Sequence, residues 1–419
     1  MAGQAEEQYS RKGVSKGRPG GVPGSGGIWV GGSPASWRLV SLGALERQLK
    51  WRLAEVATTK VHQANLTQCA QELERVLTRL GSGWSLRTFG SNANGFGTKD
   101  SDFDATCIKQ DSQESSTGLL LQVKEALHDH TNFKVVDYVA GARIPILKLR
   151  FGKKLDCDLS VNNLEILPNT QLLLTYASLH QRVRELGILV KLWAKAEGVS
   201  GASSGYLSAY ALTIMVVYFL QVDSALNLPC LPTSAFAAGT DRPQLPPVKW
   251  STNMQLFALL SRFFRFYTAE FRWGSEVASI RHGRRIFVPD PVCAQLRGCH
   301  TQRLHIEDPF LLERNLHCTL QNEQEWHFFG KIREAAQAMH AGILPHSLRC
   351  SVTPEGEEQD YSWDHQQHAG EEVPDWASAA KVASASSFAQ FGHSLPGGSR
   401  SASPGASSTA SPSAPANSK

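Results

Sequence analysis

The sequence predicts an α+β fold in which a small mixed β-sheet is followed by a helical domain. Between residues 85 and 161, short runs of alternating apolar and polar side chains are separated by turn residues, as in half-buried strands. From residue 166 to residue 345, apolar residues recur at three- and four-residue steps, as in packed helices. The chain has 419 residues, 42% of them hydrophobic, which is enough for one large or two ordinary domains.

Compositions rich in Gly, Ser and Pro mark both ends of the chain. Residues 1–40 and 346–419 lack the apolar periodicity of a packed core, so we expect disordered tails there. Between the tails, a sheet-containing domain is expected over residues 41–165 and a helical domain over residues 166–345. The first helices of the 41–165 segment could pack on the helical domain instead of on the sheet.

The elements of the first domain follow from its patterning and its turn residues. Two helical runs fill residues 42–80, and Gly81-Ser82-Gly83 ends them. A strand at residues 85–89 leads into a loop rich in Gly, Asn and Thr, and a helix ends near residue 130. Three further strands are expected at residues 133–139, 144–150 and 155–161.

The second domain is predicted to be helical throughout. Residues 206–222 carry no charge, but they contain Tyr, Ser and Gln and are short for a membrane span, so we expect a buried central helix. A proline-punctuated loop over residues 228–247 precedes a helix at residues 253–271, whose aromatic side chains we assign to the core rather than to RNA stacking. A closing helix is expected at residues 323–340.

Charge and cysteine content set only loose bounds on function. The net charge of +4 and the pI near 8.6 permit nucleic-acid binding without arguing for it. Eight cysteines without a CxxC pair favour reduced thiols in a cytosolic or nuclear protein. Cys293, Cys299 and His300 lie close in sequence, but their spacing is not that of a zinc site.

A pair of carboxylates follows the loop of the first domain. Side chains alternate along a strand, so Asp102 and Asp104 share one face while Phe103 points to the core. Two neighbouring carboxylates repel unless a cation lies between them, and Mg²⁺ bound in this way usually accompanies substrate phosphates. Upstream, Gly90 lets backbone N–H groups approach a phosphate and Ser91 adds a hydroxyl donor. Each motif alone is common on solvated strands and turns, but their combination favours nucleotidyl transfer.

A third carboxylate is available on the strand at residues 155–161. Asp156, Asp158 and Ser160 share one face of that strand. Two-metal phosphoryl chemistry uses such a third ligand to complete the clamp on attacking and leaving oxygens. Periodicity alone does not choose between Asp156 and Asp158.

The ordered motifs carry a family resemblance. Gly90-Ser91 followed by Asp102-Phe103-Asp104 resembles the DNA polymerase β-like nucleotidyltransferase superfamily. Further motifs are similar to those of noncanonical poly(A) polymerases and terminal uridylyltransferases with a poly(A)-polymerase-associated module. These motifs are Asn162-Asn163, Asn169-Thr170, residues 183–195 and Ile306-Glu307-Asp308-Pro309-Phe310. The resemblance covers about residues 45–342. It implies a nucleotidyltransferase domain and a helical central domain with the active-site cleft between them, and it selects Asp158, with Asp156 as a supporting carboxylate.

The resemblance also implies which residues bind the nucleoside triphosphate. Lys191 and Lys195, four apart on one helix face, would hold the triphosphate, although a solvated face explains them equally well on sequence alone. Ser208 would lie by the phosphates and Tyr210 would stack on the base, while Ala209 replaces a serine common in relatives. The full set of nucleotide-binding candidates is Gly90, Ser91, Asn163, Asn169, Thr170, Lys191, Lys195, Ser208, Tyr210, Asp308 and Arg314.

Base choice rests on Arg314. In uridylyltransferases of this family, a histidine before an asparagine commonly contacts the uracil edge, and here Arg314 precedes Asn315. Arginine has only donors, so it could bond O4 of uracil but not the exocyclic amine of adenine. An exposed arginine without any role in selection is as plausible. We favour UTP narrowly, with ATP as the alternative. Arg143 is an equally open case, either an RNA contact or a surface residue of an edge strand.

The resemblance therefore implies template-independent addition of ribonucleotides to RNA 3′ ends, with release of pyrophosphate. Asp102, Asp104 and Asp158 would bind Mg²⁺ or Mn²⁺. The expected partners are an RNA 3′ end, UTP or ATP and a recruiting RNA-binding adaptor, with no membrane; oligomeric state stays open. A cytoplasmic location is favoured, and nuclear or organellar ones stay open. The rival classes are a small-molecule or protein nucleotidyltransferase, a 2′-5′ oligoadenylate synthase-like enzyme and an inactive RNA-binding relative.

Overall fold

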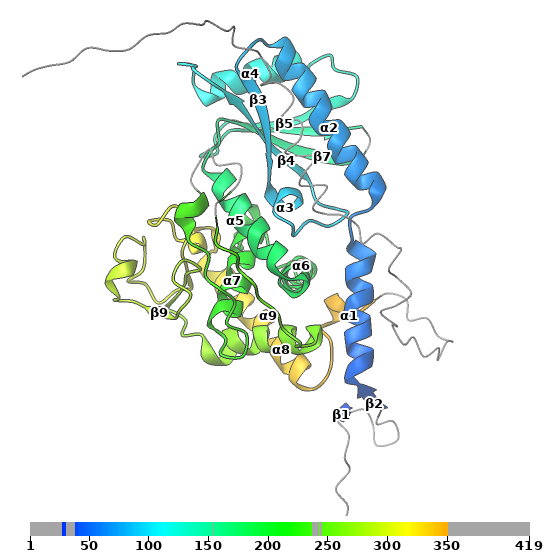
Figure 1. Cartoon of the computed structure of the whole chain (residues 1–419), viewed down its shortest axis with the longest axis vertical. Coiled ribbons are helices and arrows are strands. Elements are labelled where there is room, and N and C mark those ends of the chain that lie inside the picture. The colour runs from blue at the N-terminus through cyan, green and yellow to red at the C-terminus, as the bar shows by residue number, and fades with distance from the viewer. Residues whose placement is uncertain (1–26, 31–37, 153, 237–242, 244, 351–419) are drawn as a thin grey trace, which may run out of the picture.

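The computed structural model describes residues 27–30, 38–152, 154–236, 243 and 245–350. A five-stranded sheet with its covering helices forms one part, and a larger helical part lies below it (Figure 1). The predicted α+β class with a small mixed sheet is confirmed. Most of the two segments predicted as tails lies outside the described residues, and the domain boundaries stay predictions.

Two short structured segments, a strand pair and a 3₁₀ turn, overlap the parts of the chain that composition assigned to tails. Strands β1 (Gly27–Val30) and β2 (Arg38–Ser41) pair in antiparallel fashion, and β2 runs directly into the first helix. At the other end, a 3₁₀ turn at His346–Leu348 buries Leu348 in the helical core. Backbone pairing and a single apolar anchor leave little trace in composition, which is why sequence reasoning missed both.

The main sheet has the strand order β3-β4-β7-β6-β5. The central pair, β4 and β7, is parallel, and the outer pairs are antiparallel. The strands are β3 (Trp84–Phe89), β4 (Phe103–Lys109), β5 (Phe133–Val139), β6 (Ile146–Phe151) and β7 (Leu155–Val161). The four predicted strands of residues 85–161 are therefore present within about two residues at each end. The strand predicted for the carboxylate pair is β4, which begins at Phe103.

Helices α2 (Lys60–Arg79) and α4 (Ser116–Ala126) close one face of this sheet. Their apolar side chains and those of the strands share one core, which includes Leu73, Leu120 and Leu159. Alternation along β7 sends Cys157 and Leu159 into this core and leaves Asp158 on the opposite face. The sheet therefore presents a polar face away from α2 and α4.

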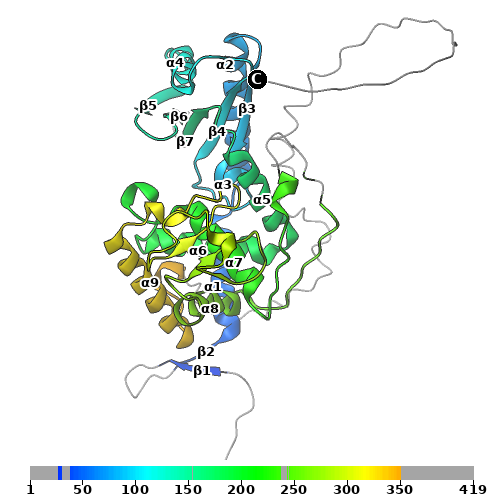
Figure 2. The same ribbon diagram turned by 90° about the vertical axis from the view of Figure 1, so that its left-hand side faces the viewer.

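The helical part has its own core, to which all its long helices contribute. Leu45 and Leu49 of α1 also belong to this core, so α1 packs on the helical part and not on the sheet (Figure 2). The helices are α1 (Leu42–Val56), α5 (Ile166–Leu179), α6 (Gln181–Ala196), α7 (Ala209–Val222), α8 (Leu256–Arg265) and α9 (Asn322–His340). A small sheet, β10-β8-β9, completes this part with β8 (Glu276–Ala278), β9 (Ile286–Phe287) and β10 (His305–Ile306).

Two predictions about the helical part are confirmed. The uncharged run of residues 206–222 contains α7, which is buried along almost its whole length, and no helix in the described ranges is both long and apolar enough to span a membrane. The segment predicted as a helix at 253–271 is α8 followed by a π-helical turn, Phe266–Glu270. Phe263, Phe264 and Phe266 are buried in the core, as expected. All eight cysteines are free thiols.

Candidate active site

The carboxylates of the site meet where the two parallel strands lie side by side. Asp104 of β4 and Asp158 of β7 are paired residues of the parallel ladder. Asp102 immediately precedes β4, and Phe103 between the two aspartates is buried in the sheet core. Because paired residues project to the same face of a sheet, the register places Asp158, not Asp156, directly beside Asp104.

Electrostatics in this cluster are unfavourable for three ionised carboxylates. Burial, together with the charges of Asp158 and Asp102, raises the pKa of Asp104 to about 7, and Lys191 opposes this shift. Burial also raises the pKa of Asp102, with the charge of Asp158 adding to it. The pKa of Asp158 is raised mainly by burial, and Lys148 partly offsets this. Carboxylates that lie close together in a partly desolvated environment stay protonated to a higher pH unless a cation binds between them.

Gly90 fits the motif because its backbone lies against a catalytic candidate. It begins the short helix α3 (Gly90–Ala93) with φ of +72°, a conformation that glycine adopts without strain. A Cβ atom at this position would overlap the carboxylate of Asp104. Ser91 follows on α3. Because glycine lacks a Cβ atom, the main chain at position 90 can approach the Asp104 carboxylate more closely than it could with any other residue there.

Two cations lie on the open face of the sheet beside the aspartates. Lys148 Nζ of β6 is 3.8 Å from Asp158 Oδ2. Arg150 Nε donates to Asp156 Oδ1 at 2.6 Å, and both side chains are about half exposed. Asp156 thus has a partner of its own at the surface.

The two lysines of α6 differ in their surroundings. Lys191 Nζ donates to the carbonyl oxygen of Phe96 at 2.7 Å. Burial lowers the pKa of Lys191 to about 8, and the negative charge of Asp104 opposes this shift. Lys195, one turn later, is exposed and close enough to Asp102 to favour its ionised form. The positive charges of Lys191 and Lys195 therefore both act on the aspartates.

A second group of candidates gathers around Tyr210 at the start of α7. The Tyr210 hydroxyl donates to Asn169 Oδ1 of α5 at 2.7 Å. Ser208 caps α7 by accepting a hydrogen bond from the Ala211 N–H at 3.2 Å. Thr170 donates its hydroxyl to the Ile166 carbonyl within its own helix at 3.0 Å. Serine at this helix N-terminus leaves backbone donors available nearby, which is favourable for a phosphate.

Asp308 shapes the loop that carries Arg314. Its side chain is fully buried, and Oδ1 accepts hydrogen bonds from the N–H groups of Phe310 and Leu311 at 3.0 and 3.1 Å. Arg314 Nη1 lies 3.5 Å from Asp308 Oδ2, with its side chain 37% exposed. Burial raises the pKa of Tyr210, as does the charge of Asp308, while Arg314 opposes them, so the three side chains share one environment. Asp308 therefore positions Arg314 near Tyr210.

The Asn-Asn motif ends β7 and ties it to β4. Asn162 adopts φ of +52°, and its Oδ1 accepts a hydrogen bond from the Lys109 N–H at 2.9 Å. The N–H of Asn163 donates to Thr106 Oγ1 at 3.1 Å. These bonds hold the parallel pair together just beyond the aspartates.

Three residues that contact the site were not predicted. Asn92 Nδ2 donates to the carbonyl of Asp102 at 2.7 Å, and Arg184 Nε donates to the carbonyl of Gly95 at 2.9 Å. Phe96 is fully buried in the helical core although it belongs to the loop before β4. The available signal was the Gly95-Phe96-Gly97 sequence, a lone aromatic residue between glycines in an otherwise polar loop.

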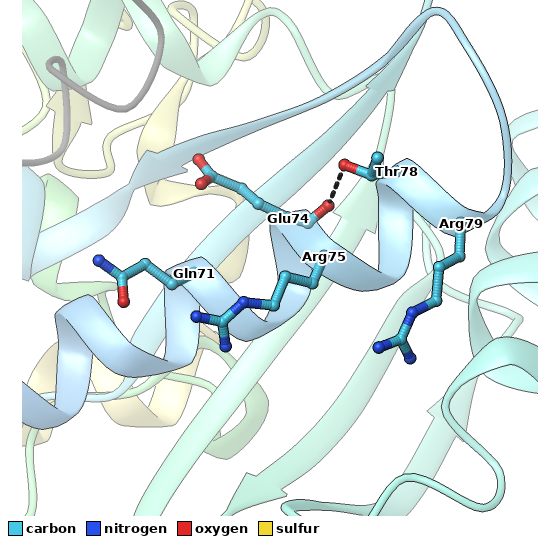
Figure 3. A pocket seen from close by; sticks show the side chains of 5 residues that line it. All are labelled: Gln71, Glu74, Arg75, Thr78 and Arg79. Carbon is cyan, nitrogen blue, oxygen red and sulfur yellow. Dashed lines mark hydrogen bonds between the residues drawn. The ribbon is translucent and has the colours of Figure 1, made fainter. Parts of the chain in front are cut away.

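A hollow elsewhere on the surface does not belong to this site. It has a volume of about 470 Å³ and lies on the outer side of α2, where Figure 3 shows its lining side chains and the bond from Thr78 Oγ1 to the Glu74 carbonyl at 2.8 Å. The lining residues are Gln71, Glu74, Arg75, Thr78 and Arg79. The opposite side of α2 packs on the sheet through Leu73 and Leu77, so α2 separates this hollow from the aspartates.

The donor set suits a hard divalent cation. Carboxylate oxygens are the ligands that Mg²⁺ prefers. The pKa values of the three carboxyl groups, Asp102, Asp104 and Asp158, are raised by burial and by neighbouring carboxylates. Within the part of the chain that the structure describes, no three His, Cys, Asp or Glu side chains are already gathered closely enough to hold an ion.

Two segments of the chain match models of known protein families. Residues 45–178 match the family model described as Poly(A) RNA polymerase, mitochondrial-like, central palm domain. Residues 255–314 match the model described as Cid1 family poly A polymerase. Both matches confirm the predicted resemblance to noncanonical poly(A) polymerases and terminal uridylyltransferases.

Individual relatives agree with this resemblance. Poly(A) RNA polymerase GLD2 of Bos taurus is 32% identical over 267 residues, which cover 58% of this chain and 53% of that protein. The chain thus spans about half the length of the curated relatives it matches. A mutant of the Cid1 poly(U) polymerase bound to MgATP has a TM-score of 0.61 at 25% identity, covering 72% of this chain and 95% of that one. Cid1 in complex with its short product ApU gives 0.62 at 25% identity, covering 73% and 96%.

Proposed function

We propose that this protein adds ribonucleotides to RNA 3′ ends without a template. The observation that carries the proposal is the in-register pair Asp104 and Asp158, which has Asp102 beside it and the α6 lysines facing it. Relatives named as poly(A) and poly(U) polymerases support the same reaction class. The presence of all three aspartates speaks against an inactive RNA-binding relative.

In this proposal, each group of residues has a separate duty. Asp102, Asp104 and Asp158 would hold divalent cations, Mg²⁺ or Mn²⁺, which would supply activation of the RNA 3′ hydroxyl and stabilisation of the leaving pyrophosphate. Lys191 and Lys195 neutralise the triphosphate as point charges. The MgATP bound to the Cid1 relative supports a metal–nucleotide substrate.

The nucleotide base is held by the second group of residues. The ring of Tyr210 stacks on the base, and its hydroxyl, held by Asn169, fixes the orientation of the ring. Ser208 and the first turn of α7 lie toward the phosphates. Asn163 and Thr170 contribute through the backbone geometry they maintain, and Asp308 acts by holding the Arg314 loop.

For the base itself, we propose a narrow preference for UTP, with ATP as the alternative. Arg314 lies in the same environment as Tyr210, and it carries donors that suit O4 of uracil. Competition between UTP and ATP should favour UTP in the wild type and shift toward ATP in Arg314→Ala. A wild-type preference for ATP overturns the base assignment, and an unchanged ratio in the variant removes Arg314 from selection.

The proposed activity is tested with purified protein, a labelled oligo-RNA and each of the four NTPs separately. We expect extension of the RNA by one or two of the NTPs in the presence of Mg²⁺ or Mn²⁺, with pyrophosphate released. The same assay with a nucleoside monophosphate, an amino acid or a small alcohol as acceptor tests the small-molecule class. Extension of no RNA under any of these conditions contradicts the proposal.

The proposal also covers how the RNA substrate is recruited and where in the cell the protein acts. No RNA-recognition motif is visible in the sequence, so we propose that an RNA-binding adaptor supplies the RNA. The free thiols in the described residues fit the predicted cytoplasmic location.

A further inference from the structure

The loop between β3 and β4 inserts one side chain into the other part of the molecule. Phe96 is fully buried, and its neighbours belong to the helical core, not to the sheet core on which β3 and β4 pack. A large aromatic ring from a polar loop thus crosses from the carboxylate-bearing sheet to α6. Relative motion between two such parts is the usual expectation unless something fixes them.

The receiving surface on α6 is shaped for this ring. A Cβ atom at Gly187 would overlap the ring of Phe96, so only glycine leaves room for it. Gly95, with φ of +85°, lies so near α5 that a Cβ atom there would be 2.8 Å from the Cβ of Ala177. The glycines on both sides of the contact therefore allow an approach that no larger residue permits.

Two cations of α6 hold the backbone of the same loop. Arg184 Nε donates to the Gly95 carbonyl at 2.9 Å, and Lys191 Nζ donates to the Phe96 carbonyl at 2.7 Å. Arg184, Gly187 and Lys191 are spaced by three and four residues, so they lie on one face of the helix. Ring, glycine and two donors make up one contact, which we call the Phe96 socket.

The ends of the loop are tied to the aspartates. Gly90 at its start lies against the Asp104 carboxylate, and Asn92 donates to the carbonyl of Asp102. A continuous series of contacts thus runs from the aspartates through the loop to α6. Its last member, Lys191, is the cation whose charge opposes the raised pKa of Asp104.

We propose that Phe96 is a positioning residue for nucleotidyl transfer. Seated in the socket, it fixes the α6 lysines relative to Asp102, Asp104 and Asp158. The inference rests on the proposed function, in which the lysines hold the triphosphate while the aspartates hold the cations. The reaction needs both groups in register along the triphosphate, and a misplacement of about 1 Å in such an arrangement can cost about 100-fold in rate.

A double-mutant cycle between Phe96 and Gly187 tests this role. Gly187→Ala pushes a methyl group into the ring, and Phe96→Leu removes the ring and empties the socket. We expect each single variant to lower kcat by about 10- to 100-fold per folded molecule, with a smaller rise in the KM for NTP. The combined variant, in which the smaller leucine makes room for the methyl group, should recover kcat to within a few-fold of the wild type.

Phe219→Leu is the matched control, because Phe219 of α7 is fully buried in the same core and packs on Phe263 and Phe266. It should lower the unfolding temperature as Phe96→Leu does and leave kcat unchanged. If Phe96→Leu does not fold, Phe96→Met serves in its place, since methionine fills irregular space.

The inference is overturned if the fold-loss of kcat in the double variant equals the product of the two single losses. It is also overturned if both single variants lose stability but keep the wild-type kcat. Absence of NTP incorporation by the wild type would instead overturn the proposed function itself, so the two failures are distinguishable.

Discussion

Asp104 is a partly buried carboxylate and Glu276 is a fully buried one, and their surroundings are opposite. Glu276 of β8 accepts hydrogen bonds from the Tyr218 hydroxyl at 2.6 Å, from Arg285 Nε at 2.8 Å and from the Arg272 N–H at 3.0 Å. Asp104 faces two other carboxylates, and its pKa is raised to about 7 by burial and by their charges. One carboxylate has the partners that its charge requires, and the other has like charges as neighbours.

The difference separates a carboxylate that supports the fold from one to which the proposed function gives a cation-binding role. A buried charge that is paired and hydrogen-bonded supports the fold, and removal of one partner is costly. A cluster of like charges lowers the stability of the metal-free fold. Binding of a ligand of opposite charge would explain why the fold keeps such a cluster. The buried acids of the helical part belong to the first kind, and the three aspartates to the second.

The largest effect is expected for Asp104→Ala. Loss of a metal ligand should reduce NTP incorporation by more than about 100-fold, because the cation supplies several kcal/mol of transition-state stabilisation. Asp156→Ala is the control on the same sheet face, since its exposed pair with Arg150 is worth only about 0.2–1 kcal/mol. Labelled-RNA extension measures both. More than about a tenth of wild-type activity in Asp104→Ala would sink the assignment.

Lys191→Ala should act on substrate binding. A charged contact to phosphate is worth about 1.5–3 kcal/mol, which corresponds to a rise in the KM for NTP of about 10- to 150-fold. Lys331, a lysine of α9 paired with Glu197 and Glu334, provides the control substitution to alanine, for which no change in KM is expected. Steady-state kinetics with saturating RNA checks this. Equal KM values for the two variants would show that Lys191 does not bind the triphosphate and contributes only to packing.

The smallest effects are expected at Tyr210. Tyr210→Ala removes the ring and should weaken all four NTPs, since stacking of a base on an aromatic ring is worth about 1–3 kcal/mol. Tyr210→Phe keeps the ring and loses only the bond to Asn169, a change of about 0.5–1.5 kcal/mol. Nucleotide titration followed by fluorescence compares them. Equal damage from both substitutions would show that the hydroxyl, not the ring, matters.

Sequence reasoning located the carboxylates because strand periodicity is local. The alternation around Phe103 was enough to place Asp102 and Asp104 on one face, and the class of fold followed from where period-two segments gave way to helical ones. The choice between Asp156 and Asp158 needed the family resemblance, and the strand register shows its physical basis, the pairing of Asp158 with Asp104.

Long-range contacts were beyond the sequence. Phe96 meets Gly187 about ninety residues later, and nothing in either segment alone indicates the partner. The hydroxyl of Tyr210 meets Asn169 in the same way, and the burial of Asp308 depends on how its loop folds back. Pairings between distant segments arise from tertiary packing, which composition and periodicity do not encode.

The central claim is that the clustered aspartates repel one another until a cation binds them. This claim predicts how the stability of the metal-free fold depends on pH. The folded state raises the pKa of Asp104 from 3.8 to about 7, so it binds that proton more tightly than the unfolded chain does. Ionisation therefore destabilises the metal-free protein increasingly between about pH 4 and pH 7, and fully above pH 7. An uncharged side chain at position 104 escapes this penalty.

Thermal unfolding of wild type and Asp104→Asn, with and without Mg²⁺ or Mn²⁺, tests the claim most directly. Without metal at pH 8, the variant should unfold at a higher temperature than the wild type, and this advantage should shrink as the pH falls toward 4. With metal, the wild type should gain stability and the variant should gain little. A metal-free variant less stable than the wild type at pH 8, with equal metal-induced shifts in both proteins, would contradict the account.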